Sequence, residues 1–254
     1  MKLYVVNLDR STDRLAETRR LFGAAGLAFE RLPAVDGAAL SPAERRRLCP
    51  PIRFRLANAM RPPQAGEIGC ALSHVKAWRT AFEGEAALAG IFEDDVEFDA
   101  PALREALETA ERQNDPAVPT VWLLQTGLPA PARADGRRCY DILETRDVGR
   151  FFATYAYVLN RAAAARLVFL QTPVVNIVDA WSAYARCGVR ILAFFRPCAS
   201  VRKVATTIAK PVGGLWRYGW YRRLFWARWR LFFRVDLLLK RFEGKRLRLP
   251  EAGT

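Results

Sequence analysis

Residues 3–37 read LYVVNLDRSTDRLAETRRLFGAAGLAFERLPAVDG, and the class of fold follows from this pattern. The run LYVVNL at its start is short, apolar and β-branched, as is typical of a buried strand. Ser11 or Thr12 then offers an N-cap for a helix over residues 12–25. Residues 27–35 predict a second strand. A strand, a helix and a strand in succession indicate parallel pairing and therefore an α/β domain.

The alternation of strands and helices continues to about residue 195. Further helices are predicted over residues 67–82, 100–113, 161–170 and 178–187. Further strands are predicted over residues 87–92, 121–125, 151–159 and 189–195. Residues 38–66 contain five prolines and predict a long surface loop with one short helix, either functional or a solvated insertion.

Positive charge is concentrated at the C-terminal end of the chain. The net charge is +14, and residues 196–254 hold 15 Lys and Arg against 3 Asp and Glu, whereas residues 1–195 hold 25 against 23. We therefore expect a near-neutral domain over residues 1–205 and a basic tail over residues 206–254. A basic tail on a neutral body favours an anionic partner, either membrane or nucleic acid.

The tail also carries aromatic side chains. Four tryptophans alternate with arginines in residues 215–243, which predicts a helix lying in an anionic membrane surface. Single-stranded nucleic acid or an oligomer interface are the alternatives, but no nucleic-acid recognition motif is present, so no nucleic acid is expected. Because neither a signal peptide nor a long uncharged run is visible, we expect a cytoplasmic protein, peripheral on the inner face of the cytoplasmic membrane.

The cysteine and histidine content predicts free thiols and argues against a zinc site. The five cysteines form no close pair, and an odd number fits reduced thiols in a cytosolic protein. There is no Cys-x-x-Cys, and His74 is the single histidine.

The acidic triplet Glu93-Asp94-Asp95 directly follows an apolar predicted strand. Residues two apart in a strand face the same way, so Glu93 and Asp95 would share a side. Mg²⁺ or Mn²⁺ would neutralise such crowded carboxylates, and ligands gather at the carboxyl ends of strands in α/β sheets. From the triplet alone, a metal site and a solvated acidic turn are equally good interpretations.

Polar residues also follow the first two predicted strands. Asn7 and Asp9 could hold a base or ribose, and Arg10 and Arg14 could reach phosphate oxygens, although an Asx turn and helix cap explain the same residues. Asp36-Gly37 could accept a ribose hydroxyl and permit close approach, or be a plain turn.

Residues 66–74, Gly-Glu-Ile-Gly-Cys-Ala-Leu-Ser-His, open a predicted helix. Their small side chains allow close packing or close approach of a ligand. His74 lies one turn after Cys70, and a lone helical histidine is more often structural than catalytic.

Together these segments resemble glycosyltransferase family 25, the lipooligosaccharide galactosyltransferase-like family. The matching pieces occur in family order over roughly residues 3–185. They are Tyr4–Arg10 with Arg14, Ala34–Gly37, Gly66–His74, Ile91–Asp95, Tyr157–Leu159, and Asp179 after Thr172-Pro173.

The resemblance implies an A-type glycosyltransferase fold, a Rossmann-like nucleotide-binding sandwich with a mostly parallel sheet, here followed by the basic, aromatic, helical tail. It implies a metal-dependent, inverting hexosyltransferase that moves galactose from UDP-galactose to a lipid-linked glycan acceptor such as lipopolysaccharide or lipooligosaccharide. The implied roles are Mn²⁺ or Mg²⁺ binding by Glu93 and Asp95, donor binding by Asn7, Asp9, Arg10, Arg14, Asp36, Gly37 and Asp94, and catalysis by Asp179 and His74.

Several alternatives stay open. Asp179 is the expected base, because it is an isolated acid in an apolar run, but it could be a helix cap or a further metal ligand. His74 could stabilise the leaving group or bind metal. The whole chain could instead be a retired transferase scaffold that binds membrane or nucleic acid, or another nucleotide-using α/β enzyme such as a nucleotidyltransferase.

Overall fold

The computed structural model describes residues 1–58, 60–125, 138–144, 151–202, 235 and 238, and the following sections concern these residues. They form a central sheet in the order β2-β1-β3-β7-β5-β8-β6, which confirms the predicted α/β class. The sheet is mostly parallel, with β7 and β6 running against their neighbours. Its strands are β1 (Lys2–Asn7), β2 (Glu30–Pro33), β3 (Leu88–Glu93), β5 (Thr120–Leu123), β6 (Cys139–Asp141), β7 (Ala156–Asn160) and β8 (Arg190–Phe194).

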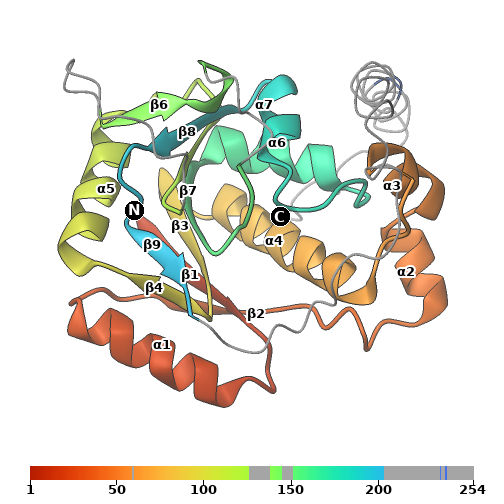
Figure 1. Ribbon diagram of the computed structural model, residues 1–254, viewed down its shortest axis with the longest axis horizontal. Coiled ribbons are helices and arrows are strands. Elements are labelled where there is room, and N and C mark those ends of the chain that lie inside the picture. Colours follow the sequence, from red (N-terminus) through yellow and green to blue (C-terminus); the bar gives the residue numbers. More distant parts are fainter. Residues whose placement is uncertain (59, 126–137, 145–150, 203–234, 236–237, 239–254) are drawn as a thin grey trace, which may run out of the picture.

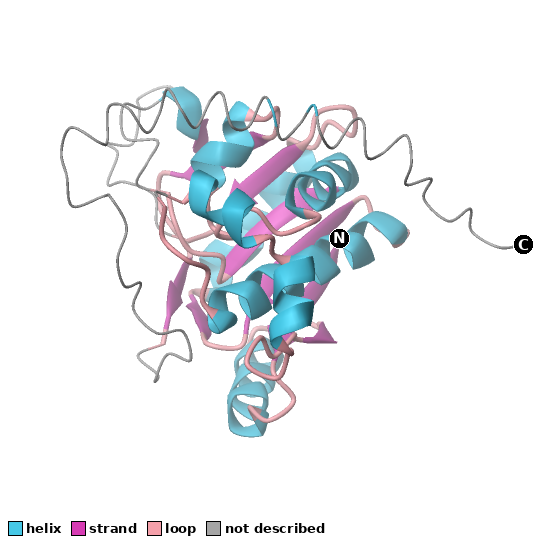
Figure 2. Ribbon diagram, turned by 90° about the vertical axis from the view of Figure 1, so that its right-hand side faces the viewer, coloured by secondary structure: helices cyan, strands magenta, loops and turns pink. Residues whose placement is uncertain are grey.

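Helices cover both faces of this sheet (Figures 1 and 2). α1 and α5 lie on one face, and α4, α6 and α7 lie on the other. A separate two-stranded sheet pairs β4 (Val96–Phe98) with β9 (Ala199–Val201). The helices are α1 (Thr12–Ala24), α2 (Pro42–Leu48), α3 (Pro51–Ala57), α4 (Ala65–Glu83), α5 (Ala100–Arg112), α6 (Arg161–Gln171), α7 (Trp181–Arg186) and the 3₁₀ turn η1 (Ile142–Glu144).

The alternation of side chains along β1 explains why its sequence is apolar throughout. Tyr4 and Val6 point into the core beneath α4, whereas Leu3 and Val5 point into the core that contains Phe22 of α1. A strand covered on both faces has no side that needs polar residues.

Most predicted elements are confirmed, and the differences are local. Residues 38–66 contain two short helices, α2 and α3, instead of one, because Ser41 and Glu44 form a capping box and Pro51 starts a second helix. The predicted strand over 151–159 is confined to β7 and is antiparallel.

The predicted helix over 178–187 starts only at Trp181, and its N-cap is Ala180. Asp179 is therefore not the helix cap. The short strands β4, β6 and β9 were not predicted. The tail over 206–254 and the region 215–243 lie outside the described residues, apart from Val235 and Leu238.

In the described part of the chain, no helix is both long enough and apolar enough to cross a bilayer.

The loop after β2 packs directly against the start of α4 through two glycines. A Cβ atom on Gly69 would lie 2.5 Å from the backbone nitrogen of Gly37 and 2.6 Å from the carbonyl oxygen of Val35. A Cβ atom on Gly37 would lie 1.8 Å from the carbonyl oxygen of Ala65. These neighbours are backbone atoms that cannot rotate away. Both glycines are required to bring the end of β2 beside α4, which explains the small residues of the 66–74 segment.

We predict that Gly69→Ala lowers the free energy of unfolding by about 2 kcal/mol or more, because overpacking of a backbone contact cannot be relieved locally. Gly23→Ala is the matched control: Gly23 lies inside α1, and a Cβ there meets nothing within 4 Å. The control should stabilise the protein by about 0.5–1 kcal/mol. Urea denaturation measures both, and equal effects of the two variants would contradict the close contact.

Candidate active site

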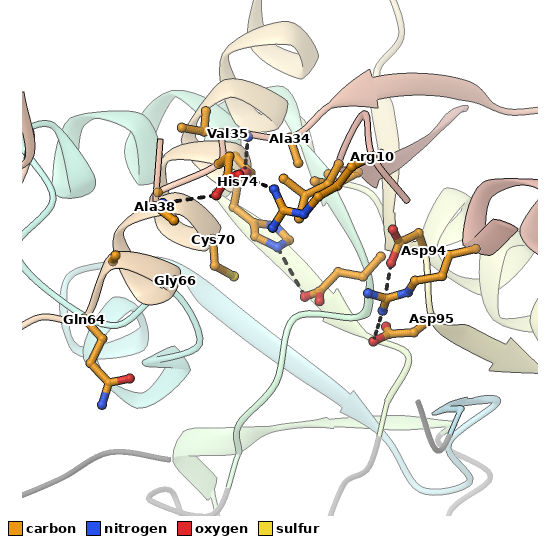
Figure 3. Close-up of a pocket in the computed structure, with 18 residues that line it drawn as sticks. Arg10, Ala34, Val35, Ala38, Gln64, Gly66, Cys70, His74, Asp94 and Asp95 are labelled. Carbon is orange, nitrogen blue, oxygen red and sulfur yellow. Dashed lines mark hydrogen bonds and ion pairs between the residues drawn. The ribbon is translucent and has the colours of Figure 1, made fainter. Parts of the chain in front are cut away.

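The carboxyl ends of β1, β2 and β3 surround a cavity of about 590 Å³. β1 pairs in parallel with both neighbours, so all three strands end at the same edge of the sheet. Side chains from these ends and from α4 point into the cavity (Figure 3). Eight of the predicted site residues line it: Arg10, Arg14, Asp36, Gly37, His74, Glu93, Asp94 and Asp95.

Asp94 is buried and is held by four side chains. Asn7 donates to its Oδ2 at 2.7 Å, and Arg14 forms an ion pair with its Oδ1 at 2.9 Å. Thr18 donates to its backbone carbonyl at 2.9 Å. Arg202 also donates to this carbonyl. Burial raises the pKa of Asp94, against the opposing effects of Asn7 and Arg14. Asn7 is itself buried and does not line the cavity, so in this structure it positions Asp94.

Asp95 has one paired and one unpaired carboxylate oxygen. Its Oδ2 lies 2.6 Å from Arg14 Nη2, whereas its Oδ1 is buried and has no hydrogen-bond partner. Burial and the nearby charge of Glu93 raise the pKa of Asp95 to about 6, although Arg14 opposes the shift. A buried oxygen without a partner is costly unless a ligand or ion binds it.

Glu93 is fixed by one residue of α4 and by one residue of the loop before β7. His74 Nε2 lies 3.3 Å from Glu93 Oε1, and Thr154 donates to the same oxygen at 2.6 Å. Burial alone would raise the pKa of Glu93, but the hydrogen bonds from His74 and Thr154 outweigh it and the pKa is lowered. Glu93 is therefore ionised in a partly buried position.

His74 links Glu93 to the protein core. It is 1% exposed, and its Nδ1 lies 2.8 Å from the hydroxyl of Tyr157, which also accepts from Trp78 Nε1 at 2.8 Å. A carboxylate can only accept, so the proton of neutral His74 belongs on Nε2, and Nδ1 accepts from Tyr157. His74 thus reaches the cavity with one nitrogen and holds Glu93.

A second cavity of about 260 Å³ adjoins the first. The two share Cys70, Glu93 and Asp95 in their walls, and the second also contains Asp179. The Oδ2 of Asp179 accepts a hydrogen bond from the backbone N–H of Ala153 at 3.1 Å. Burial raises the pKa of Asp179, and the charge of Glu93 raises it further.

The remaining predicted residues differ in their relation to the cavity. Arg10 forms an ion pair with Asp36 at the mouth of the cavity. Asp9 is exposed, pairs with Arg31 and does not line the cavity. Gly37 lines it, but its lack of a side chain is first required by the contact with α4.

The structure adds residues that the sequence did not single out. Thr18 and Arg202 hold the turn of the acidic triplet, and Thr154 holds Glu93. Tyr157 holds His74, and Trp78 holds Tyr157 in turn. Only Tyr157 lay within a segment noted for its family resemblance. Thr18 comes from α1 and Trp78 from α4, whereas Thr154 and Arg202 lie 61 and 108 positions along the chain from Glu93 and Asp94. No local pattern marks them.

The acidic residues fit a divalent cation, but Asp95 and Glu93 do so in different surroundings. Asp95 offers an oxygen without a partner, which suits Mg²⁺ or Mn²⁺. Among the described residues, Glu93 forms a close group with Cys70 and His74, whose ligand atoms all lie within 4.8 Å of one another. A cation bound to Asp95 would supply the charge that neutralises a diphosphate.

A family comparison identifies the chain. Its first half, residues 1–127, matches the model of glycosyltransferase family 25 (LPS biosynthesis protein). The chain belongs to glycosyltransferase family 25. The match contains β1, β2, α4 and the acidic triplet, which are the elements that build the first cavity.

Named relatives match about 100 residues of the chain. A glycosyltransferase 25 family member of Anopheles gambiae is 36% identical over 101 residues, which is 38% of this chain and 17% of the relative. Procollagen galactosyltransferase 2 of Homo sapiens is 31% identical over 100 residues, 39% of this chain and 16% of the relative. The matched part of the chain thus spans about a sixth of the length of these curated relatives.

We predict that Asp95→Asn stabilises the protein in the absence of ligand. The pKa of Asp95 is about 6 in the fold against 3.8 in a free side chain, so the folded state holds the proton between these values and the unfolded state does not. Stability therefore falls as the pH rises through this range. At about pH 7.5 the variant should gain about 1–3 kcal/mol, since one pKa unit corresponds to about 1.4 kcal/mol.

Urea denaturation at several pH values measures this gain. The gain in stability should vanish at pH values below the pKa of the free side chain, where Asp95 carries the proton in both the folded and the unfolded wild-type protein. Glu97→Gln, which changes an exposed neighbouring acid, is the control and should change stability little at either pH. A loss of stability in Asp95→Asn at neutral pH would contradict the unfavourable burial of this charge.

Proposed function

We propose that the protein is an inverting hexosyltransferase with an A-type glycosyltransferase fold. It moves galactose from UDP-galactose to a lipid-linked glycan such as lipopolysaccharide or lipooligosaccharide, with Mn²⁺ or Mg²⁺ as cofactor. The observation that carries the proposal is the pair of adjoining cavities, which meet at Cys70, Glu93 and Asp95. The larger one has the size of a small-ligand site. The name of the human relative, a galactosyltransferase, supports the choice of sugar.

The larger cavity suits the donor. Its rim carries Arg10 and Arg14, whose guanidinium groups can bind phosphate oxygens, and Asp36, which can accept from ribose hydroxyls. When bound at Asp95, with Glu93 beside it, the cation would neutralise the diphosphate as it leaves. Asn7 and Asp9, which do not line the cavity, would act through Asp94 and Arg31.

The smaller cavity suits the acceptor hydroxyl. Asp179 takes the proton of that hydroxyl, the hydroxyl oxygen forms a bond to the anomeric carbon, and the bond from that carbon to the diphosphate breaks. An acceptor that approached from the second cavity, opposite the leaving group, would invert the configuration. A base works best when its pKa lies near the working pH. Burial raises the pKa of Asp179 and so brings it closer to that pH.

We predict that Asp179→Asn lowers kcat by about 10²–10⁴-fold while the KM for the donor changes little, because a base contributes to the chemical step. The asparagine oxygen can still accept from Ala153, so the fold should be kept. A screen of nucleotide sugars, read by release of UDP, gives the donor and both constants. Unchanged turnover in Asp179→Asn would remove it as the base.

Two further results separate this proposal from its rivals. Asp95→Ala should lose sugar transfer, with Glu97→Gln as the active control. Undiminished transfer by Asp95→Ala would contradict the metal role of Asp95.

Calorimetry of wild-type protein with UDP and Mn²⁺ should show binding. An absence of binding would favour a retired scaffold that binds membrane or nucleic acid, and turnover of a nucleoside triphosphate would favour a nucleotidyltransferase.

We also propose that the protein is cytoplasmic and binds the inner face of the cytoplasmic membrane, through residues 215–243 and through α3. Ile52, Leu56 and Met60 lie four residues apart along α3 and the turn that follows it, and are 76%, 39% and 43% exposed. Exposed Arg46, Arg47 and Arg55 flank them. Apolar residues beside arginines suit an anionic lipid surface. A lipid-linked acceptor would then be presented near the cavities.

Co-sedimentation with vesicles tests this attachment. Both a chain of residues 1–212 and the double variant Ile52→Asp/Leu56→Asp should bind anionic vesicles more weakly than the intact chain does. Phe82→Asp, which changes an exposed apolar residue of α4, is the control and should bind like wild type. Equal binding by all four proteins would contradict the attachment, as would equal binding to neutral and anionic vesicles.

A further inference from the structure

Cys70, His74 and Glu93 bring three kinds of metal-binding atom together at the passage between the two cavities. Cys70 and His74 are one turn apart on α4, and Glu93 ends β3. The Sγ, imidazole and carboxylate atoms all lie within 4.8 Å of one another. Figure 3 shows Cys70 and His74 on the same side of α4, directed into the cavity. The lack of a Cys-x-x-Cys motif argued against a zinc site. It could not reveal this group, because the third member, Glu93, comes from a strand.

We propose that these three side chains form a site for a thiolate-preferring divalent cation such as Zn²⁺, and that a cation bound there inhibits the protein. The site is distinct in chemistry from the Mn²⁺ or Mg²⁺ site at Asp95. Carboxylate oxygens suit the harder cations, whereas a thiolate and an imidazole select zinc-like ones.

The distances are close to those of a tetrahedral zinc site. Ligand atoms around such a zinc ion lie about 3.4–3.6 Å apart, given bonds of about 2.0–2.3 Å. His74 Nε2 and Glu93 Oε1 are already 3.3 Å apart. The remaining adjustment falls on the Cys70 sulfur, which rotates about a single bond. The fourth position would face the cavities and be open to water.

The residues behind His74 suit a metal ligand. A zinc-bound histidine donates its other N–H to a fixed acceptor. Without the metal, Nε2 carries the proton and donates to Glu93. With the metal on Nε2, the proton resides on Nδ1 and is donated to the oxygen of Tyr157, whose two lone pairs can accept from both His74 and Trp78. The proposal therefore includes a change of tautomer at His74.

The surrounding charges favour a cation. Among the described residues, neither Glu93 nor Asp179 has an ion pair with a lysine or arginine, and Asp95 shares Arg14 with Asp94. Burial and the charges of Glu93 and Asp179 raise the pKa of the Cys70 thiol well above its usual value, so the free protein carries a neutral thiol. Binding of the cation releases that proton, and the nearby carboxylates stabilise the added positive charge.

Inhibition follows from the position and rests on the proposed function. Cys70 and Glu93 line both cavities, so a cation between them occupies the passage where the donor sugar and the acceptor would meet. It would also withdraw Glu93 from the donor side.

The binding test uses Co²⁺ as a spectroscopic probe of the full-length wild-type protein. We expect a thiolate-to-cobalt charge-transfer band that added Zn²⁺ removes. Cys70→Ala should lose this band and bind Zn²⁺ at least about tenfold more weakly, since even loss of an outer partner of a metal ligand costs about 10–100-fold. Cys49→Ala removes a buried thiol outside the group and should retain the band. A band that persists in Cys70→Ala would overturn the proposal.

A second measurement needs no variant. Because His74 is the single histidine, ¹⁵N-labelled imidazole gives one pair of nitrogen signals. Zn²⁺ should convert the pattern of a protonated Nε2 into that of a metal-bound Nε2 with a protonated Nδ1. Unchanged signals at saturating Zn²⁺ would overturn the proposal even if Cys70→Ala failed to fold.

The effect on activity is measured separately. Zn²⁺ should inhibit sugar transfer by the wild type at concentrations that leave Cys70→Ala at least about tenfold less affected. Binding without inhibition would overturn the inhibitory role alone. A wild type that binds Zn²⁺ as expected but transfers no sugar would contradict the proposed function and leave the metal site supported.

Discussion

The parallel pairing of β1 with both β2 and β3 is the constraint on which the site depends. Its register sets Asn7 opposite Pro33 on one side and Val6 opposite Glu93 on the other. Because the three strands end together, one amide side chain at the end of β1 can hold an acid that follows β3. A shift by one residue would turn Asn7 to the other face of the sheet and separate it from Asp94.

The second consequence of this arrangement is a concentration of like charge. The acidic triplet and Asp179 lie around the junction of the cavities, while Arg14 is the one arginine or lysine that forms ion pairs with the triplet among the described residues. Burial raises the pKa of Asp94, Asp95 and Asp179, so the ionised form of each acid is disfavoured by its surroundings. Binding of a cation would favour the ionised forms, and such a trade of stability for function is common in functional sites.

The sequence predicted what local patterns determine. Apolar periodicity and capping residues are local features of the sequence, so they predicted β1, α1, α4, α5 and β3. The acidic triplet was placed beside Asp36 and Arg14 because parallel strands end together. The direction of β7 was not predicted, since a strand of five buried residues reads the same in either direction.

The partners of the site residues could not be predicted, because they meet only through tertiary structure. Arg202 reaches the carbonyl of Asp94 across 108 positions of sequence, and Thr154 reaches Glu93 from a loop before an antiparallel strand. The same holds for Cys70, which reads as a buried thiol in a helix until β3 is set beside it.

The antiparallel strand β7 has a consequence for the chain as a unit. The family match ends at residue 127, before β7, yet β7 lies between β3 and β5 and carries Tyr157. A protein ending at that residue would expose β3 and β5 as open edges, each ready to pair with another copy and aggregate. The two halves are therefore interleaved rather than consecutive. Exchange of the second half between relatives would preserve the fold only if the incoming segment again inserted a reversed strand into the middle of the sheet.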